Sequence, residues 1–231
     1  MSLNADLILF VVLPYVAVAL AVIVSVRRYF SDGFSFSSLS SQFLESGRLF
    51  WGSVAFHYGL LVVLAGHLIA LLVPSGVIAF SRVPVRLFLL EATGLAFGLL
   101  ALVGVVLLSY RRASVSRVRA VTSRWDVILL LLLLSQIATG VFTAIFHRWG
   151  AAWSVHTAIP YLWSLAALSP RPELVAALPL MARLHIINAF ALIAIIPFTR
   201  LVHFLVVPVW YLWRPYQVVV WNRKRTASPG G

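Results

Sequence analysis

Residues 50–73 read FWGSVAFHYGLLVVLAGHLIALLV, and this stretch contains no Asp, Glu, Lys or Arg. An α-helix rises about 1.5 Å per residue, so about 20 apolar residues cross the roughly 30 Å hydrocarbon core of a bilayer. The stretch is therefore long enough and apolar enough to predict a transmembrane helix. Its unbroken apolarity also argues against a strand of a membrane barrel, in which about ten residues alternate between apolar and polar.

Four further stretches have the same character: residues 7–26, 87–110, 127–146 and 184–211. Together the five predict an all-α integral membrane protein built as a five-transmembrane-helix bundle. The first stretch has no basic residue before it and is longer than a signal-peptide core, so we expect it to remain in the protein. No internal repeat or soluble segment of domain size separates the spans, and residues 1–231 are expected to form a single membrane domain.

The composition excludes several classes of protein. The chain is 62% hydrophobic and 10% charged, whereas soluble domains are about half apolar and about a quarter charged. A disordered chain would need a high charge density. The net charge of +12 is carried by residues too sparse for a nucleic-acid surface, so no nucleic-acid partner is expected. The absence of cysteine excludes disulfides, thiolate metal sites, cysteine-bound iron–sulfur clusters and covalently attached c-type haem.

Basic residues are distributed unevenly between the two sides of the predicted membrane. Residues 27–49, 111–126 and the tail after 211 carry 12 Lys and Arg, whereas the segments on the other side carry five. The positive-inside rule then places the N-terminus outside, in the periplasm, and the C-terminus in the cytoplasm. We expect the basic cytoplasmic tail, residues 212–231, and the inner loops to form either a docking surface for partner subunits or an aromatic interface belt. The outer loop, residues 147–183, is expected to lie on the membrane as an amphipathic helix or to cover a site as a lid.

Four of the six histidines lie in the predicted spans: His57 and His67 in one, His185 and His203 in another. An ionisable ring in hydrocarbon is costly without a partner and marks a functional site. A single such ring would better suit a hydrogen bond between helices, whereas four on two helices favour ligation. Along a helix the first pair is separated by about 15 Å and the second by about 27 Å, so neither helix can bring both of its histidines to one metal ion. Because the two spans run in opposite directions, pairing across helices joins His57 with His203 near the inner face and His67 with His185 near the outer face. Two stacked imidazole pairs are what two b-type haems require.

The unequal separations require a bend, and Pro197, between the last two histidines, is predicted to kink its helix. Small residues near the histidines either allow the close approach of a flat macrocycle or simply pack one helix on another. They are Gly59, Gly66, Gly94, Gly98 and Gly104. Of these, Gly66 is the strongest candidate for contact with a ring or a substrate, because it immediately precedes His67.

Several short elements resemble the gamma subunit, the membrane cytochrome b, of the respiratory membrane-bound nitrate reductase. The strongest are Phe56-His57-Tyr58-Gly59, Gly66-His67, Arg183-Leu184-His185, PFTRLVH at 197–203 and VPVWYL at 207–212. Weaker matches are Ser40-Ser41-Gln42, Arg117-Val118-Arg119-Ala120 and Asp126. The likeness extends over nearly the whole chain and is weakest in the outer loop.

The resemblance implies a subunit in the cytoplasmic (inner) membrane of a prokaryote that holds two non-covalent b haems. Such a subunit oxidises quinol or menaquinol at the outer haem and passes electrons to an iron–sulfur (beta) subunit. That partner supplies a molybdenum (alpha) subunit, which reduces nitrate, so no nitrate site is expected on this chain. The resemblance assigns His67 and His185 to the outer haem and His57 and His203 to the inner one, as the topology does.

The resemblance also implies candidates for the quinol site, although no catalytic residue is certain: Gly66, His67 and Arg86. Arg86 stands where members of the family have a Lys. An arginine keeps the charge but does not give up a proton, so Arg86 is expected to orient a quinol oxygen or a haem propionate. The alternative is a basic residue that only anchors a helix end.

Charged residues near the predicted membrane edges are candidates for binding haem propionates. Arg112 and Arg200 are placed for the inner haem and Arg183 for the outer, although Arg112 equally suits the positive-inside pattern. Glu91 is either a relay for quinol protons or a paired or snorkelling acid. Asp126 is expected to be an acid favoured by the helix dipole at the start of a span.

Two rival functions remain. One is a related dihaem cytochrome b of a heterodisulfide- or sulfite-reductase-type complex, which the co-purifying subunits would identify. The other is a histidine-dependent membrane transporter without haem, which a visible spectrum would distinguish.

Overall fold

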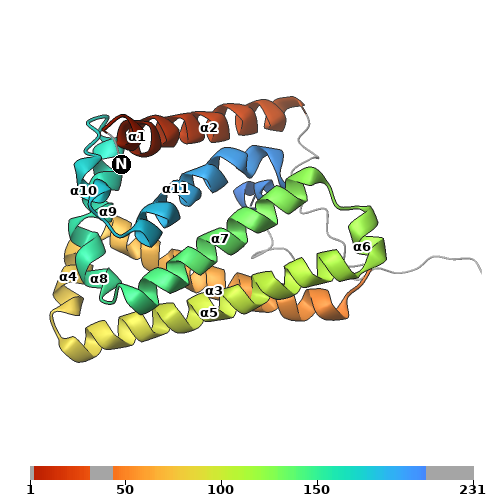
Figure 1. Ribbon diagram of the computed structural model, residues 1–231, viewed down its shortest axis with the longest axis horizontal. Coiled ribbons are helices and arrows are strands. Elements are labelled where there is room, and N and C mark those ends of the chain that lie inside the picture. The colour runs from red at the N-terminus through yellow and green to blue at the C-terminus, as the bar shows by residue number, and fades with distance from the viewer. Residues whose placement is uncertain (1–2, 32–43, 207–231) are drawn as a thin grey trace, which may run out of the picture.

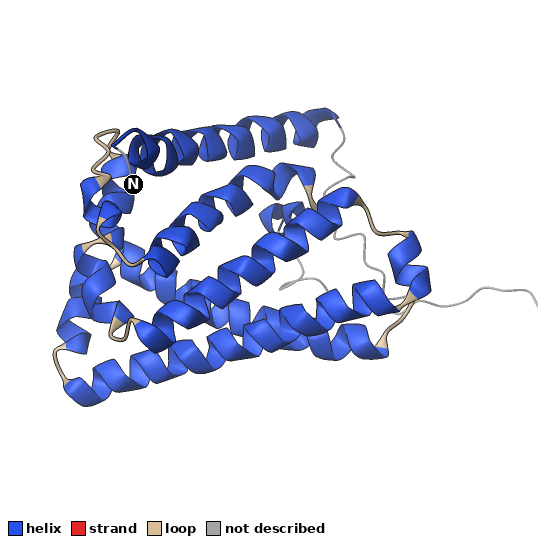
Figure 2. Cartoon of the chain, in the orientation of Figure 1, coloured by secondary structure: helices blue, strands red, loops and turns tan. Residues whose placement is uncertain are grey.

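The computed structural model describes residues 3–31 and 44–206, and all regular structure within these two ranges is helical (Figure 2). The first part of the described chain contains α1 (Leu3–Leu7), the π-helix η1 (Ile8–Val12), α2 (Leu13–Ser31), α3 (Gly47–Leu72), α4 (Pro74–Ser81), α5 (Pro84–Ser114) and α6 (Ser116–Ala120). The second part contains α7 (Arg124–Phe146), α8 (Gly150–Trp153), the 3-10 helix η3 (Ser154–His156), α9 (Ala158–Ala166), α10 (Glu173–Ala176), α11 (Leu180–Ile195), and the 3-10 helices η4 (Ile196–Phe198) and η5 (Arg200–Val206).

Within the described ranges, five helical segments are long and apolar enough to cross a membrane. They are Ala5–Ser31, Gly47–Leu72, Pro84–Ser114, Arg124–Phe146 and Leu180–Phe198. Each overlaps one of the five stretches predicted from the sequence, so the prediction of an all-helical protein with five membrane-crossing helices is confirmed.

The five long helices lie side by side in an order different from their order in the chain. In Figure 1, α2, α11, α7 and α5 follow one another from top to bottom, and α3 packs against α5. The first and last long helices are therefore neighbours. Among the described residues, α3 and α11 share no extensive packing interface, since α3 packs on α5 while α11 packs on α7 and α2.

Two glycines allow α3 and α5 to pack with their backbones in contact. A Cβ atom on Gly59 would lie 2.5 Å from the backbone nitrogen of Ala101, and one on Gly104 would collide with the backbone of Phe56. Within lipid the hydrophobic effect does not drive helices together. The close packing that small residues allow at such crossings stabilises the helix pair instead. Gly59 and Gly104 are thus helix-packing residues, whereas no described atom lies within 4 Å of a Cβ built on Gly66 or Gly94.

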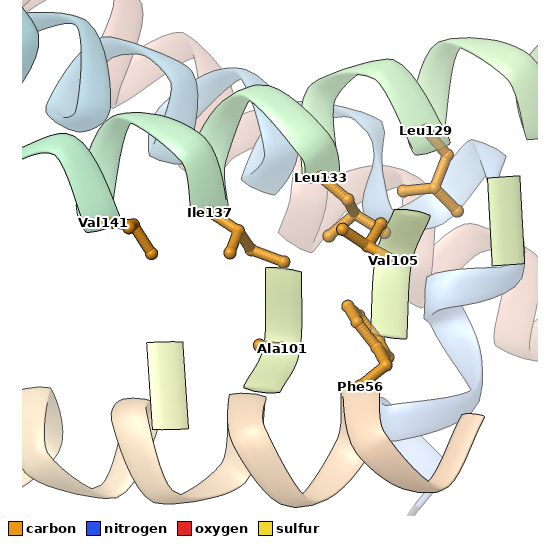
Figure 3. Close-up of a cluster of buried hydrophobic side chains, with 7 residues drawn as sticks. All are labelled: Phe56, Ala101, Val105, Leu129, Leu133, Ile137 and Val141. Atoms are coloured by element: carbon orange, nitrogen blue, oxygen red, sulfur yellow. The ribbon is translucent and has the colours of Figure 1, made fainter. Parts of the chain in front are cut away.

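The buried apolar side chains form two cores. One lies between α3, α5 and α7 and consists of Phe56, Ala101, Val105, Leu129, Leu133, Ile137 and Val141 (Figure 3). The other joins the first helix, α9, α10 and α11 and consists of Phe10, Ala17, Tyr161, Leu165, Val175 and Phe190. The second core attaches the region between α7 and α11 to the end of the bundle that holds the start of α2.

We call residues 148–179 the cap, and the end of the bundle that they cover the cap end. The cap lies within the predicted outer loop, residues 147–183, and it folds as four short helices. Trp163 donates its indole N–H to the carbonyl of Leu71 at 3.1 Å, and Tyr15 donates its hydroxyl to the carbonyl of Leu165 at 3.0 Å. These bonds connect the cap to the C-terminal end of α3 and to the first long helix.

The last long helix ends earlier than the sequence predicted. Residues 184–211 were expected as one span, but α11 ends at Ile195. Pro197 cannot donate a hydrogen bond to the carbonyl of Ile193, and that carbonyl instead accepts the N–H of Ile196 in a 3-10 turn. Thr199 is extended, with φ −122° and ψ 178°, and separates η4 from η5. The bend predicted at Pro197 is therefore a complete break in the α-helix.

Candidate functional site

Two of the four predicted haem-ligating histidines face each other across helices. The imidazole rings of His67, on α3, and His185, on α11, have centroids 6.3 Å apart and planes inclined by 33°. The two helices, which lack an extensive packing interface, thus approach each other through these rings. The sequence predicts the same pair, because two spans that run in opposite directions bring His67 and His185 to the same side of the membrane.

All four histidines hold their Nδ1 atom against a backbone carbonyl. His57 Nδ1 lies 2.8 Å from the carbonyl oxygen of Ser53, and His67 Nδ1 lies 2.8 Å from that of Val63. For His203 the partner is Arg200 at 2.6 Å, and for His185 it is Gln136 at 2.9 Å. A carbonyl only accepts, so this network assigns the proton to Nδ1 and leaves the lone pair on Nε2.

Anchoring of one ring nitrogen to a carbonyl is the usual arrangement of a metal-binding histidine, because it fixes the tautomer and the ring orientation. Among the described residues, no group of three or more His, Cys, Asp or Glu side chains could hold a bare metal ion. Imidazoles whose Nε2 is unprotonated instead suit a metal whose remaining ligands come from a macrocycle, as in bis-histidine haem. The donor chemistry of these residues therefore fits b-type haem.

His57 and His203, the pair predicted near the inner face, are not in direct ring contact in the described part of the chain. His57 is exposed and lies edge-on to Phe56, with ring centroids 5.2 Å apart. His203 lies in η5, where the neighbouring Leu201 packs against the core that contains Phe56. The break after α11 therefore places η5 against the core shared by α3, α5 and α7, and the pairing of these two histidines stays a prediction.

Residues of α7 and α11 that the sequence did not single out surround His185. Gln136 Nε2 lies 3.1 Å from His185 Nε2, and Thr139 Oγ1 lies 3.3 Å from His185 Nδ1. A Cβ atom on Gly140 would lie 2.9 Å from Cε1 of the same ring. Asn188, one turn after His185, donates to Gln136 Oε1 at 2.8 Å. The spacing of 136, 139 and 140 on one helix face within a leucine-rich span was the signal that could have identified them.

Asp126 brings two of the predicted propionate-binding arginines together. Arg200 Nε lies 2.6 Å from Asp126 Oδ1, and Arg112 Nη1 lies 3.1 Å from Asp126 Oδ2. Asp126 is buried, and it forms a capping box with Ser123 at the start of α7. The expected helix-start acid is therefore also the centre of an ion-pair cluster. We call the end of the bundle that holds this cluster the arginine end.

The third propionate candidate, Arg183, lies at the opposite end of the bundle. Its guanidinium contacts Asp6 at 2.7 Å and lies 5.5 Å from the ring centroid of Phe10. Arg183 is on α11, two residues before His185, so the guanidinium and the imidazole belong to the same region of the cap end.

Glu91 and Arg86, both predicted on the outer side of the membrane, are found near the cap. Glu91 accepts a hydrogen bond of 2.6 Å from the backbone N–H of Ala151 in α8, so its carboxylate connects α5 to the cap. Arg86 is exposed and lies over the ring of Phe80 at 5.7 Å. The contacts of Gly59 with Ala101 set the register of α3 and α5, and in that register Arg86 lies about 10 Å closer to the cap end than His67.

Two groups outside the spans have shifted pKa values. The backbone N–H of Arg48 and the guanidinium of Arg111 hydrogen-bond the carboxylate of Glu45 and hold its pKa below the usual value. Burial raises the pKa of the Tyr161 phenol far above its usual value, so this hydroxyl remains a hydrogen-bond donor at all physiological pH values.

Comparison with known proteins covers nearly the whole chain. A family model described as nitrate reductase gamma subunit matches residues 6–222. The chain is 33% identical over 222 residues to the nitrate reductase gamma chain of Bacillus subtilis (strain 168), covering 95% of this chain and 98% of that one. It is 32% identical over 219 residues to the respiratory nitrate reductase 1 gamma chain of Escherichia coli (strain K12), covering 93% and 96%.

A further relative is much longer than this chain. The nitrate reductase-like protein NarX of Mycobacterium tuberculosis (strain CDC 1551 / Oshkosh) is 35% identical over 211 residues, which are 89% of this chain and 32% of that protein. The matching region recurs there as part of a larger polypeptide. On the family match and on the full-length likeness to the two gamma chains, the chain belongs to the nitrate reductase gamma subunit family.

Proposed function

We propose that this chain is the membrane cytochrome b (gamma) subunit of a respiratory nitrate reductase and that it supplies the complex with electrons from quinol. The observation that carries the proposal is the opposition of His67 and His185, with ring centroids 6.3 Å apart and each Nδ1 held on a backbone carbonyl. This arrangement puts the proton of each ring on Nδ1 and leaves Nε2 of two helices as the nitrogens for axial ligation of one haem iron. At His185, iron would take the place of the Gln136 amide that lies 3.1 Å from Nε2.

In this proposal His67 and His185 hold the outer haem, and His57 and His203 hold the inner haem. When bound, the two haems carry single electrons between quinol and the partner subunit. Arg112 and Arg200 at the arginine end are candidates for the propionates of the inner haem, and Arg183 at the cap end for those of the outer haem. Each of these arginines also contacts a carboxylate, so it is held in place whether or not it binds a propionate.

The quinol site is proposed beside His67, at the cap end. Gly66 precedes His67 and leaves its surroundings open, since no described atom lies within 4 Å of a Cβ built there. Arg86 would orient a quinol oxygen by donating a hydrogen bond, and it would not accept a proton, because a guanidinium stays charged. From its position about 10 Å farther out, its long side chain would have to point back toward His67.

The sidedness proposed from the loop charges places the cap end outside and the arginine end in the cytoplasm. Quinol oxidised near the cap end would release its protons outside, while its electrons pass inward. Each elementary charge moved against about 100 mV stores roughly 2.3 kcal/mol. Cleavage of the cap by protease added to intact cells, with the tail protected, would support this orientation.

The partners proposed for the arginine end are the iron–sulfur (beta) subunit and, through it, the molybdenum (alpha) subunit. Arg117 and Arg119 of α6 are exposed there and provide positive charge for such a contact. The basic tail, also predicted as a docking surface, lies outside the described residues. The inner membrane of a prokaryote is the proposed location.

The test is a reduced-minus-oxidised visible spectrum of the purified complex and of histidine variants. The complex is expected to show two low-spin b haems. His67→Ala and His185→Ala should each remove the same haem, and His57→Ala and His203→Ala the other, while His156→Ala, on the exposed surface of the cap, should retain both. Retention of both haems in His67→Ala would refute the ligand assignment, and a colourless wild-type complex would refute the whole proposal in favour of a transporter.

A further inference from the structure

The Nδ1 atom of His185 is held by a different helix, unlike that of the other three histidines in the spans. His57, His67 and His203 each place Nδ1 on a carbonyl three or four residues earlier in their own helical segment. His185, on α11, instead places Nδ1 on the carbonyl of Gln136, on α7, at 2.9 Å. The orientation of the His185 ring is therefore set by α7 rather than by its own helix.

A threonine side chain of α7 contacts the same nitrogen of the ring. Thr139 Oγ1 lies 3.3 Å from His185 Nδ1. The single proton of this hydroxyl goes to the nearer of two carbonyls, that of Ser135 at 2.7 Å rather than that of Gln136 at 3.1 Å. A lone pair of Oγ1 is therefore left to accept from the imidazole. The Nδ1 proton is shared between two acceptors of α7, the Gln136 carbonyl and the Thr139 hydroxyl.

Gly140 makes room for the ring against α7. A Cβ atom there would lie 2.9 Å from Cε1 and 3.3 Å from Nδ1 of His185. Carbon atoms in contact are separated by about 3.5–4.0 Å, so an alanine at this position would push the ring away from α7. The absence of a side chain at residue 140 is therefore what brings Nδ1 within reach of both acceptors.

These contacts on Nδ1 do not compete with ligation of a metal. An iron bound by His185 would take Nε2 and displace the Gln136 side-chain amide, which lies 3.1 Å from that atom. Nδ1 is the other nitrogen of the ring, so its proton stays on the two acceptors of α7 while Nε2 is ligated. An acceptor on Nδ1–H makes the imidazole a more basic ligand. A more basic ligand donates more electron density to the iron, which favours the oxidised state.

We propose that Thr139 is a positioning residue that accepts a hydrogen bond from Nδ1 of His185 and lowers the reduction potential of the outer haem. Gly140 supports this role because it lets the ring lie against α7. The inference rests on the proposed function, since it concerns the haem assigned there to His67 and His185. The effect should be confined to that haem, because the Thr139 hydroxyl contacts no other histidine among the described residues.

The experiment is a potentiometric titration of the haem spectra in the full complex in membranes, with Thr139→Val as the test variant. Valine keeps the shape of threonine but lacks the hydroxyl. Both haems should remain, and the one-electron reduction equilibrium of the outer haem should shift about threefold toward the reduced form, which is about 28 mV. The potential of the inner haem should not change.

Two further variants separate the hydroxyl from a general disturbance of α7. Thr139→Ser keeps the hydroxyl and should retain the wild-type potential of the outer haem. Ser135→Ala, at an exposed position one turn earlier on α7, is the matched control and should shift neither haem.

Gly140→Ala tests the position of the ring. The new methyl group should displace the ring from both acceptors and so change the outer haem more than Thr139→Val does, by a larger rise in potential or by loss of that haem. Gly98→Ala is its control, since a Cβ atom there would lie 3.4 Å from the Val141 side chain, and it should change neither haem.

An unchanged outer potential in Thr139→Val, with both haems present, would overturn the inference, and so would an unchanged outer haem in Gly140→Ala. If Thr139→Val loses the outer haem, Thr139→Ser decides: a wild-type potential supports the role of the hydroxyl, and a shifted potential or a lost haem refutes it. The proposed function fails separately, because its failure would appear as the absence of two b haems in the wild-type complex.

Discussion

The hydroxyl of Tyr161 donates a hydrogen bond of 2.8 Å to the carbonyl oxygen of Phe10, and both residues are fully buried. In a regular α-helix this carbonyl would accept from the residue four positions later, which is Pro14 and has no N–H. The first helix departs from α geometry at this point and forms the π-helix η1. A side chain from the cap thus donates to a backbone carbonyl that Pro14 cannot serve.

Tyr161→Phe is expected to destabilise the protein by about 1–3 kcal/mol, because the buried Phe10 carbonyl would lose its donor. The thermal unfolding midpoint in detergent is the measurement. Tyr58→Phe, at an exposed position of α3, is the control and should leave the midpoint unchanged. Burial raises the pKa of Tyr161, so its contribution should persist below about pH 10 and decline at higher pH in the wild type only. Equal midpoints for Tyr161→Phe and the wild type would contradict the role of this bond.

Alanine substitutions at two glycines of α5 should have different effects on the stability of the protein. In Gly104→Ala the new methyl group meets the backbone of Phe56, which cannot yield as a flexible side chain would. We expect a loss of about 1–3 kcal/mol or failure to accumulate in the membrane. Gly94→Ala meets no described atom within 4 Å and should be neutral or more stable by up to about 1 kcal/mol, since alanine favours a helix. Unfolding midpoints that move together would refute the close packing of α3 on α5.

Asp126→Asn should destabilise the arginine end strongly, because it leaves the guanidiniums of Arg112 and Arg200 without the carboxylate they share. Removal of one member of a buried ion pair costs about 3–5 kcal/mol. A double-mutant cycle with Arg200→Gln measures the coupling, and the double variant should be less destabilised than the sum of the single variants. Strict additivity would show that the pair contributes nothing.

Glu45 provides a prediction at acid pH. Its folded pKa is lowered by hydrogen bonds from the Arg48 N–H and the Arg111 guanidinium, so its stabilising effect is present above the unfolded value of about 4.3. The effect is lost as pH falls through the folded pKa. Unfolding midpoints of the wild type and Glu45→Gln between about pH 6 and pH 3 should therefore converge as the pH falls. Curves that remain parallel would exclude a linked titration at this residue.

The proposed role of Arg86 in quinol oxidation can be tested with two substitutions, one that removes its positive charge and one that keeps it. Arg86→Gln should slow quinol oxidation about tenfold, the effect of losing one hydrogen bond worth about 1.4 kcal/mol, while both haem spectra persist. Arg86→Lys should retain most of the rate, since it keeps a charged donor. Arg82→Gln, also exposed and in the same connection, is the control. A normal rate in Arg86→Gln would reduce this residue to an anchor of the helix end.

The sequence was sufficient to predict the long helices and the His67–His185 pair. Apolar runs of membrane-spanning length need no tertiary information, and opposite helix directions leave few ways to combine histidines. Pro197 was sufficient to predict a bend, because the lost N–H is a local property. It did not predict that α11 would end at Ile195, since that depends on how η5 packs against the core between α3, α5 and α7.

The cap and the side chains that surround His185 could not be predicted in the same way. Tyr161 reads as an interfacial aromatic residue, and only the tertiary structure shows its hydroxyl on Phe10, 151 residues earlier. Gln136 and Asn188 are amides without charge, and a single amide in a span attracts less notice than a histidine. Their partnership depends on the register of α7 against α11, which the apolar pattern leaves open.

The packing of α2 on α11 has a consequence for how the protein is made. A ribosome adds about 5–20 residues per second, so the segment from Ser31 to Leu180 takes roughly 8–30 seconds to synthesise. During that time the first span is already in the bilayer while its main partner has not left the translocon. Early insertion therefore yields a helix whose inner face is covered only by lipid or by a helper protein, and assembly is completed after translation of the fifth span.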